Sequence, residues 1–289
     1  MWLLAALSGA FFKALSGYNR KKVSHLSSGV FTFIYCVISA VLLLPFVILF
    51  HSPVLDFILR EPVIAIGAAI GSQAGMLMNV KALSKEELSF VAPLNGMIPV
   101  IGVLLAWLTL GELPPPLGIL GVLIIFIGTY VMALDIKHTA WHSPVTRLFT
   151  SSAAQLSLGV AIAYTVNTIF IKMATNAGYD AFTILYSISL IGVAMFIYVP
   201  FSHKRIEIIH AVKSHPKQLF GSAVNSQLGS YLHNVAVSLT FVGYALAVRR
   251  FDTIFSVLLG WKLLDESNIR NKLIGAMIIV AGSALVVLH

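Results

Sequence analysis

Charged and polar side chains interrupt one long apolar stretch, residues 243–263, at a spacing that could form a binding surface. Arg249 and Asp252 are three positions apart, so they share one face of a helix, and Ser256 extends that face by another turn. About 20 apolar residues can cross a bilayer, where a charge is costly and marks a functional site by default. We therefore predict that these residues line a substrate site. Two alternatives are structural: the side chains of Arg249 and Arg250 reach lipid headgroups, or Asp252 joins helices through an ion pair.

Further polar side chains lie in other apolar stretches and could complete such a site. The stretch 150–172 carries Tyr164 and Asn167 three positions apart, and the stretch 218–239 is too polar to face lipid on all sides. His233 could exchange a proton near neutral pH and couple a transport cycle to protons; alternatively, it hydrogen-bonds a neighbouring helix. The predicted substrate-binding residues outside 243–263 are Asn79, Asn95, Tyr164, Asn167, Gln227, Tyr231, His233 and Asn234.

The sequence lacks the signatures of enzymes and of metal or cofactor sites. It has no glycine-rich phosphate loop and no His-Glu-x-x-His run, and it offers no basis for a catalytic triad. The single cysteine, Cys36, excludes an intrachain disulfide and a cysteine-based metal cluster. We expect a protein that is not an enzyme and that uses no cofactor and no metal ion.

The composition indicates that most of the chain lies in a membrane. Of the 289 residues, 58% are hydrophobic and 10% are charged, whereas soluble domains carry about 25% charged residues. The apolar stretches leave no room for a large soluble domain, and the formal net charge of +8 belongs to loops rather than to a nucleic-acid surface. We predict an all-α integral membrane protein with ten transmembrane helices. The ten stretches are 1–16, 28–50, 62–81, 88–110, 117–134, 150–172, 181–200, 218–239, 243–263 and 272–288.

The two halves of the chain repeat one another, since a shift of 154 positions aligns residues 71–134 with 225–288 without a gap. Each half then holds five helices, and because five is odd, the second half enters the membrane from the opposite side. Inverted repeats are typical of secondary transporters, whose site lies between the repeats; the alternative is a duplicated bundle without a cavity. We predict a first repeat at 1–134, a linker at 135–149 and a second repeat at 150–289. Informative identities are Gln73/Gln227, Gly75/Gly229, Trp107/Trp261, Glu112/Glu266, Gly121/Gly275 and Gly128/Gly282, and upstream Lys13 aligns with Lys172. The last two glycine pairs lie two helical turns apart and predict packing faces, and Glu112 and Glu266 are expected at the ends of their helices.

Two segments carry a resemblance to a known family. They are Ala82-Leu-Ser…Ser89-Phe-Val-Ala-Pro93-Leu…Leu110-Gly-Glu112…Gly121…Gly128-Thr-Tyr130 and Tyr244-Ala-Leu-Ala-Val-Arg-Arg250…Phe255-Ser…Gly260…Glu266…Gly275-Ala-Met…Gly282. Together they resemble the EamA-type branch of the drug/metabolite transporter superfamily. The resemblance implies ten helices in two inverted five-helix halves, a central cavity and export of small metabolites. One departure is a long basic first loop after a very short first helix, 1–16.

These observations favour a secondary transporter in the cell (inner) membrane. We expect export of an amino-acid-like or other polar or anionic small molecule by alternating access, through a cavity lined by stretches 3, 4, 6, 8 and 9. The expected partners are this small-molecule substrate, membrane lipid and protons as a coupling ion, with no nucleic acid, in a monomer or homodimer. Two alternatives stay open: a flippase for a lipid or lipid-linked intermediate, and a membrane scaffold subunit that transports nothing.

The basic residues also predict an orientation. Of the 19 lysines and arginines, 15 fall on the side that holds the first connection, two fall on the opposite side, and Arg249 and Arg250 lie within a span. Basic residues of short loops stay in the cytoplasm. The count therefore places both chain termini outside, although transporters that this chain resembles usually keep them inside.

Overall fold

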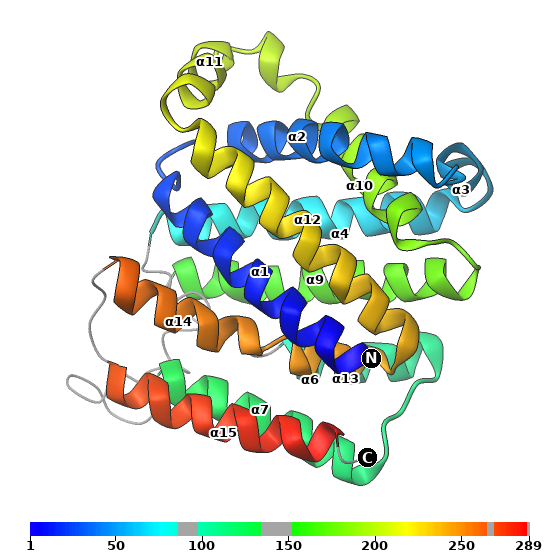
Figure 1. The fold of residues 1–289 in the computed structure, drawn as a ribbon, viewed down its shortest axis with the longest axis vertical. Coiled ribbons are helices and arrows are strands. Elements are labelled where there is room, and N and C mark those ends of the chain that lie inside the picture. Colours follow the sequence, from blue (N-terminus) through cyan, green and yellow to red (C-terminus); the bar gives the residue numbers. More distant parts are fainter. Residues whose placement is uncertain (86–97, 134–151, 265–268, 288–289) are drawn as a thin grey trace.

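The structure, a computed structural model, describes residues 1–85, 98–133, 152–264 and 269–287, and within these ranges it is helical and contains no strand (Figure 1). The first half holds α1 (Trp2–Lys22), α2 (Ser28–Leu49), α3 (Val54–Arg60), α4 (Pro62–Leu83), α6 (Ile98–Leu110) and α7 (Pro116–Ala133). The second half holds α9 (Ser152–Asn176), α10 (Ala181–Met195), the 3₁₀ turn η2 (Val199–Phe201), α11 (Arg205–Ser214), α12 (Pro216–Leu239), α13 (Val242–Val248), α14 (Phe251–Leu264) and α15 (Ile269–Val287).

Helices of the described residues overlap each of the ten predicted apolar stretches. Four described segments are long and apolar enough to cross a membrane, namely Ser28–Leu49, Pro62–Leu83, Gln155–Asn176 and Ala181–Phe201. Two others, Ile98–Leu110 and Pro116–Gly128, are apolar but shorter. The count of ten transmembrane spans stays a prediction, and so does the linker at 135–149, which lies outside the described residues.

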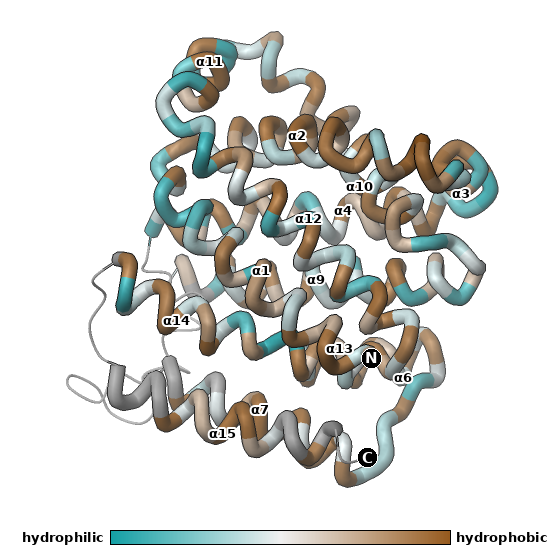
Figure 2. The backbone as a smooth tube through the Cα atoms, in the orientation of Figure 1, coloured by the Kyte–Doolittle hydropathy of each residue, from teal (hydrophilic) through white to brown (hydrophobic). Residues whose placement is uncertain are grey.

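Side-chain polarity is distributed as lipid-surrounded helices require. Large apolar side chains are exposed, for example Leu59 at 77% and Phe201 at 85% of their surface, while Ser16, Thr32 and Ser187 are fully buried. In Figure 2 hydrophilic positions are frequent around α11 and near α3, and α2 is hydrophobic over much of its length. An apolar outside and hydrogen-bonded hydroxyls inside fit a bundle whose solvent is lipid.

Helices of one half cross helices of the other at glycines. A Cβ on Gly128 of α7 would lie 2.8 Å from the carbonyl oxygen of Gly275 in α15, and a Cβ on Gly282 of α15 would lie 2.8 Å from that of Gly121. These two close approaches are related by the 154-residue repeat. The sequence prediction that these glycines form packing faces is confirmed, because any larger residue would push the two backbones apart.

Hydrogen bonds across the other two crossings, α1 on α12 and α9 on α4, fix how the repeats correspond. The Ser16 hydroxyl donates to the Ser222 carbonyl, and the Asn167 amide donates to the Ala68 carbonyl, at 2.9 and 2.8 Å. Lys21 donates to the Leu83 carbonyl, and Lys172 donates to the Val237 carbonyl, at 2.9 and 3.0 Å. The acceptors of each pair are 154 positions apart and the donors 151.

The sequence alignment of Lys13 with Lys172 is therefore wrong. With a separation of 151 positions between α1 and α9, Lys172 corresponds to Lys21, and Lys13 corresponds to Tyr164. The error arose because a lysine was matched to a lysine across a loop of unequal length. Only the carbonyls that the side chains reach reveal the true correspondence.

The predicted short first helix and long basic loop are also wrong, because α1 continues through Arg20 to Lys22. Arg20 is buried, and it donates to Asn79 Oδ1 at 2.8 Å and to the Ser16 hydroxyl at 3.1 Å. These partners accept hydrogen bonds from the buried guanidinium, so the helix does not end where the apolar run ends. Lys13 was one of the 15 basic residues assigned to the side of the first connection. In the structure it lies in the middle of α1.

Candidate substrate pocket

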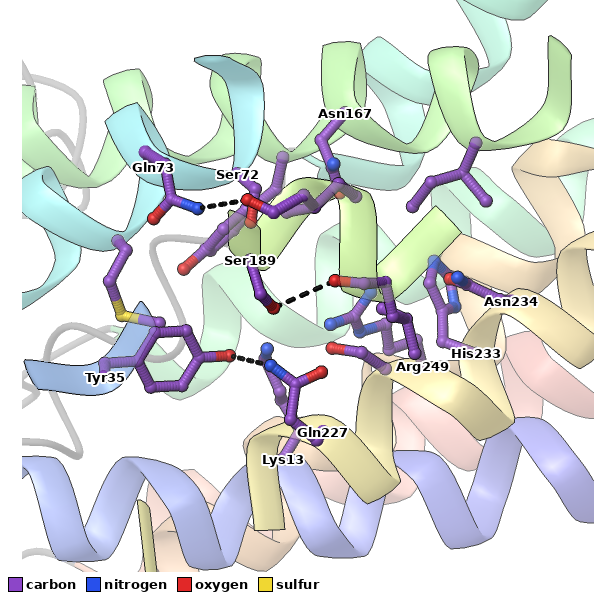
Figure 3. A pocket seen from close by; sticks show the side chains of 16 residues that line it. Lys13, Tyr35, Ser72, Gln73, Asn167, Ser189, Gln227, His233, Asn234 and Arg249 are labelled. Carbon is purple, nitrogen blue, oxygen red and sulfur yellow. Dashed lines mark hydrogen bonds between the residues drawn. The ribbon is translucent and has the colours of Figure 1, made fainter. Parts of the chain in front are cut away.

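A polar cavity of about 40 Å³ lies between the two halves of the molecule (Figure 3). Its walls come from α1, α2 and α4 of the first half, from α9, α10 and α12 of the second, and from the residue that follows α13. The volume is room for a few water molecules. The polar side chains that line it are Lys13, Tyr35, Ser72, Gln73, Tyr164, Asn167, Ser189, Gln227, Ser230, His233, Asn234 and Arg249.

A hydrogen-bonded chain holds one wall of the pocket in place. Lys13 Nζ donates to the Ser226 hydroxyl at 3.1 Å and lies 5.7 Å from the centre of the Tyr164 ring. The Tyr35 hydroxyl donates to the same Ser226 oxygen at 2.9 Å, and the Gln227 amide donates to the Tyr35 oxygen at 3.2 Å. Because each partner fixes the next, these four side chains form a preorganised polar surface.

Arg249 enters the pocket from a break in the ninth stretch. The stretch was predicted as one helix, but α13 ends at Val248 and α14 begins at Phe251. Across the break, Arg250 N donates to the Ala247 carbonyl and Asp252 N to the Arg249 carbonyl, a spacing of three residues in place of four. Such a local change of helix type is typical of functional hinges, and broken helices line the sites of many transporters.

The break separates Arg249 from the residues that were predicted to share its face. Asp252 lies in the first turn of α14, where its carboxylate is 3.5 Å from the Arg250 guanidinium. Neither Asp252 nor Ser256 is part of the pocket wall, although Ser256 is buried. The prediction of one continuous face through these three residues is wrong, because it assumed an uninterrupted helix.

Several pocket atoms have no hydrogen-bond partner among the described residues. They are buried, and they belong to four lining residues: the Tyr164 hydroxyl, Gln227 Oε1, both ring nitrogens of His233, and the side-chain oxygen and nitrogen of Asn234. An unsatisfied buried polar group costs about 1–3 kcal/mol, so proteins rarely leave several together. A cluster of such atoms around a cavity therefore indicates a place for a polar guest.

The predicted site residues divide between this pocket and other surroundings. Tyr164, Asn167, Gln227, His233, Asn234 and Arg249 line it. Asn79 does not, because its oxygen is taken by Arg20. Tyr231 stacks on Phe182 instead, with ring centres 4.8 Å apart. Asn95 lies outside the described residues.

Sequence reasoning missed Lys13, Tyr35, Gln73, Ser189 and Ser230 as pocket residues. The signal for Lys13 was present, since a charge seven residues before Arg20 falls on the same helical face. It was lost because the first stretch was taken to end at residue 16. The other four are uncharged residues on helices whose rotation the sequence does not fix.

Next to the pocket, an ion pair secures the junction between α12 and α13. Lys172 Nζ lies 3.4 Å from Glu112 Oε1, and it donates to the carbonyls of Val237 and Thr240. Glu112 Oε2 accepts the backbone N–H of Val242 at 3.0 Å. Free carbonyls at the end of one helix and a free amide at the start of the next are thereby satisfied. The predicted position of Glu112 at the end of its helix is confirmed.

Among the described residues, no group of three or more histidine, cysteine, aspartate or glutamate side chains could hold a metal ion. Cys36 is a free, buried thiol that donates to Gln73 Oε1 at 3.2 Å.

Comparisons with known proteins agree with this architecture. The profile of the EamA-like transporter family matches residues 1–134 and again residues 151–288. A solved structure described only as "Crystal structure of protein" superposes with a TM-score of 0.70 at 15% sequence identity, over 98% of this chain and 96% of the other. At that identity the likeness concerns the fold alone. No curated protein is significantly similar in sequence.

Proposed function

The chain belongs to the EamA-like transporter family, and from this premise we propose that it is a secondary transporter that exports a small polar metabolite by alternating access. One observation carries the proposal: a polar pocket with unsatisfied hydrogen-bonding atoms lies where the two repeats meet. Secondary transporters with inverted repeats bind their substrates at that place. A scaffold subunit has no need for buried polar atoms that lack partners.

The size of the pocket supports a cycle with an occluded state. A volume of about 40 Å³ holds a few water molecules but no metabolite, so substrate entry requires the helices to separate. The break between α13 and α14 is a place where the helices can bend, because its backbone already departs from α-helical hydrogen bonding. Movement there would carry Arg249 with it.

Ligand-dependent stability tests this function. A ligand present at 100 times its dissociation constant adds about 2.7 kcal/mol to the free energy of unfolding. We expect a soluble metabolite to raise the unfolding temperature of the purified protein, and Asn234→Leu to abolish the rise. Asn225→Leu is the matched control, since Asn225 lies on the same helix and donates to the Gly221 carbonyl, away from the pocket.

The alternatives give different results in the same experiment. Stabilisation by phospholipids or polyprenyl phosphates, with none from any soluble metabolite, would support a lipid flippase. No stabilisation by either class, together with no transport in proteoliposomes, would support a scaffold and contradict the proposal.

We also propose protons as the coupling ion, with His233 as the residue that exchanges them. Its two ring nitrogens have no hydrogen-bond partner among the described residues. They face a pocket lined by Lys13, Asn234 and Arg249, and the Arg250 charge also acts on the ring. An inward-directed proton gradient should drive substrate out of wild-type vesicles against its gradient. If His233→Gln retains this uphill export, His233 is not the coupling residue.

For orientation, we propose both termini outside, in the inner membrane of the cell. Removing Lys13 and Arg20, which lie within α1, and Lys172, which lies within α9, leaves 13 basic residues against one, and basic residues of short loops stay in the cytoplasm. A periplasmic phosphatase fused after His289 should be active, and a fluorescent protein exported unfolded there should be dark. The reverse pair of results would place the termini inside.

A further inference from the structure

We infer that the cargo of this pocket is a small organic anion, held between Lys13 and Arg249. The inference rests on the proposed transport function and adds the charge of the substrate. Three observations support the inference. Two of the lining residues are positively charged, no described carboxylate forms an ion pair with them, and the remaining polar atoms of the lining are neutral.

Among the described residues, the lining of the pocket carries two cationic side chains and no carboxylate. Lys13 comes from α1 of the first half and Arg249 from the α13–α14 break of the second, and both point into the cavity (Figure 3). The neighbouring carboxylate, Asp252, lies outside the lining and pairs with Arg250, and it interacts with Lys13 and Arg249 only through space. An empty pocket is therefore positively charged.

Neither cation forms an ion pair within the described part of the chain. Lys13 has the Ser226 hydroxyl and the face of the Tyr164 ring as partners, and both are uncharged. The Arg249 guanidinium has no hydrogen bond to a described residue, and the nearest carboxylate that favours its charge, Asp252, lies outside the lining. Charges removed from water without a counter-charge are strongly unfavourable, and the bilayer around the bundle deepens this penalty. An anionic guest would supply the missing charge.

The other polar atoms argue against a cation and against a zwitterion of zero net charge. Gln227 Oε1 and Asn234 Oδ1 are amide oxygens, which accept a hydrogen bond but carry no charge. An ammonium group would find neither a carboxylate nor relief from repulsion by the two cations. The Tyr164 hydroxyl and Asn234 nitrogen can donate to further oxygens of a guest. This chemistry fits a short carboxylate or phosphate ester that also bears hydroxyl or carbonyl groups.

Efflux from loaded proteoliposomes tests the inference on many candidate substrates at once. Vesicles containing the full-length protein are filled with a polar metabolite extract, and mass spectrometry identifies compounds that leave faster than from protein-free vesicles. We expect these compounds to be anions at pH 7. Selective release of neutral or cationic compounds would overturn the inference and leave transport intact, whereas no release would contradict the proposed function itself.

Defined probes then separate carboxylates from phosphates. Succinate and glycerol 3-phosphate are compared with the uncharged succinamide and glycerol, and with putrescine as the cation, for their ability to slow release of the most strongly exported compound. At least one of the two anions should compete at least tenfold more strongly than its uncharged counterpart. Equal competition by charged and uncharged members of both pairs would contradict anion recognition.

Variants connect the selectivity to the two cations. Lys13→Met should reduce anion efflux at least tenfold, Lys13→Arg should retain part of it, and Arg249→Gln should also reduce it. Lys81→Met, at an exposed position away from the pocket, should behave as wild type. Full anion efflux from well-folded Lys13→Met and Arg249→Gln proteins would overturn the inference, and the efflux profile of the wild type decides it even if a variant does not fold.

Discussion

Two of the crossings between the repeats, α1 on α12 and α9 on α4, share the hydrogen bonds that dock the helices. They differ in the side chains that face the pocket. Ser16 and Asn167 occupy corresponding positions, and each donates to the corresponding carbonyl of the opposite helix. Lys21 and Lys172 do the same one and a half turns further on. These interactions recur in both halves because each half needs them to dock against the other.

At the pocket the corresponding positions have diverged. Lys13 of α1 has Tyr164 as its counterpart, and the two meet across the cavity. Asn79 of α4 corresponds to His233 of α12, yet Asn79 is bound to Arg20 while His233 has no partner. Arg20 itself corresponds to Ile171, which lines the pocket and cannot hydrogen-bond through its side chain. The first repeat therefore fills this position with a hydrogen bond between Arg20 and Asn79, whereas the corresponding His233 of the second repeat faces the cavity.

The largest effect on stability should come from the helix junction held by the α9 lysine. Lys172→Met leaves the Glu112 carboxylate without its cation and the carbonyls of Val237 and Thr240 without their donor. We expect a loss of about 3 kcal/mol in the free energy of unfolding. Denaturation of the purified protein in detergent measures it, with Lys81→Met as the exposed control. A loss no larger than that of the control would show that the junction does not depend on this ion pair.

The divergent pair Asn79 and His233 should give opposite phenotypes. Asn79→Leu removes the oxygen that accepts from Arg20 Nη1 and should lower the free energy of unfolding by about 2 kcal/mol. His233→Leu removes only atoms that have no partner, so stability should be unchanged or higher while transport falls. Unfolding and efflux measured on both variants check this contrast. An equal loss in the free energy of unfolding of the two variants would contradict this prediction.

The smallest effect should come from the equivalent pair Ser16 and Asn167. Ser16→Ala and Asn167→Ala each remove one hydrogen bond to a carbonyl, which should lower the free energy of unfolding by about 1 kcal/mol in either case. Similar losses would support equivalent structural roles for the two residues. A much larger loss at one of them would mean that the two hydrogen bonds contribute unequally to the free energy of unfolding.

The fold could be predicted from the sequence to the extent that it depends on hydrophobicity and repetition. Long apolar stretches indicated the helices, and the glycines at 121, 128, 275 and 282 indicated a close crossing that the structure contains. The end of α1 could not be predicted, because Arg20 is stabilised by Asn79 from a distant helix. Hydropathy measures each residue alone and cannot register such a partner.

The pocket was predicted in part. Gln227, His233, Asn234 and Arg249 were found because polar side chains within apolar helices are rare. Asp252 was misplaced because the break before α14 leaves no proline or glycine signal in the sequence around Arg249 and Arg250. Tyr35 and Ser189 were not found, since similar residues on the same helices face other helices and only the rotation of each helix decides which ones reach the cavity.

Charge-dependent labelling of the pocket tests the central claim most directly, namely that solutes reach this pocket and that its charge favours anions. Ser230, which lines it, is replaced by cysteine in a Cys36→Ser background, which removes the only native thiol. An anionic methanethiosulfonate should modify Ser230→Cys faster than a cationic reagent of similar size, and the exported metabolite should protect the cysteine. No modification by either reagent would show that solutes do not reach the pocket, and faster modification by the cationic one would show that its charge does not favour anions.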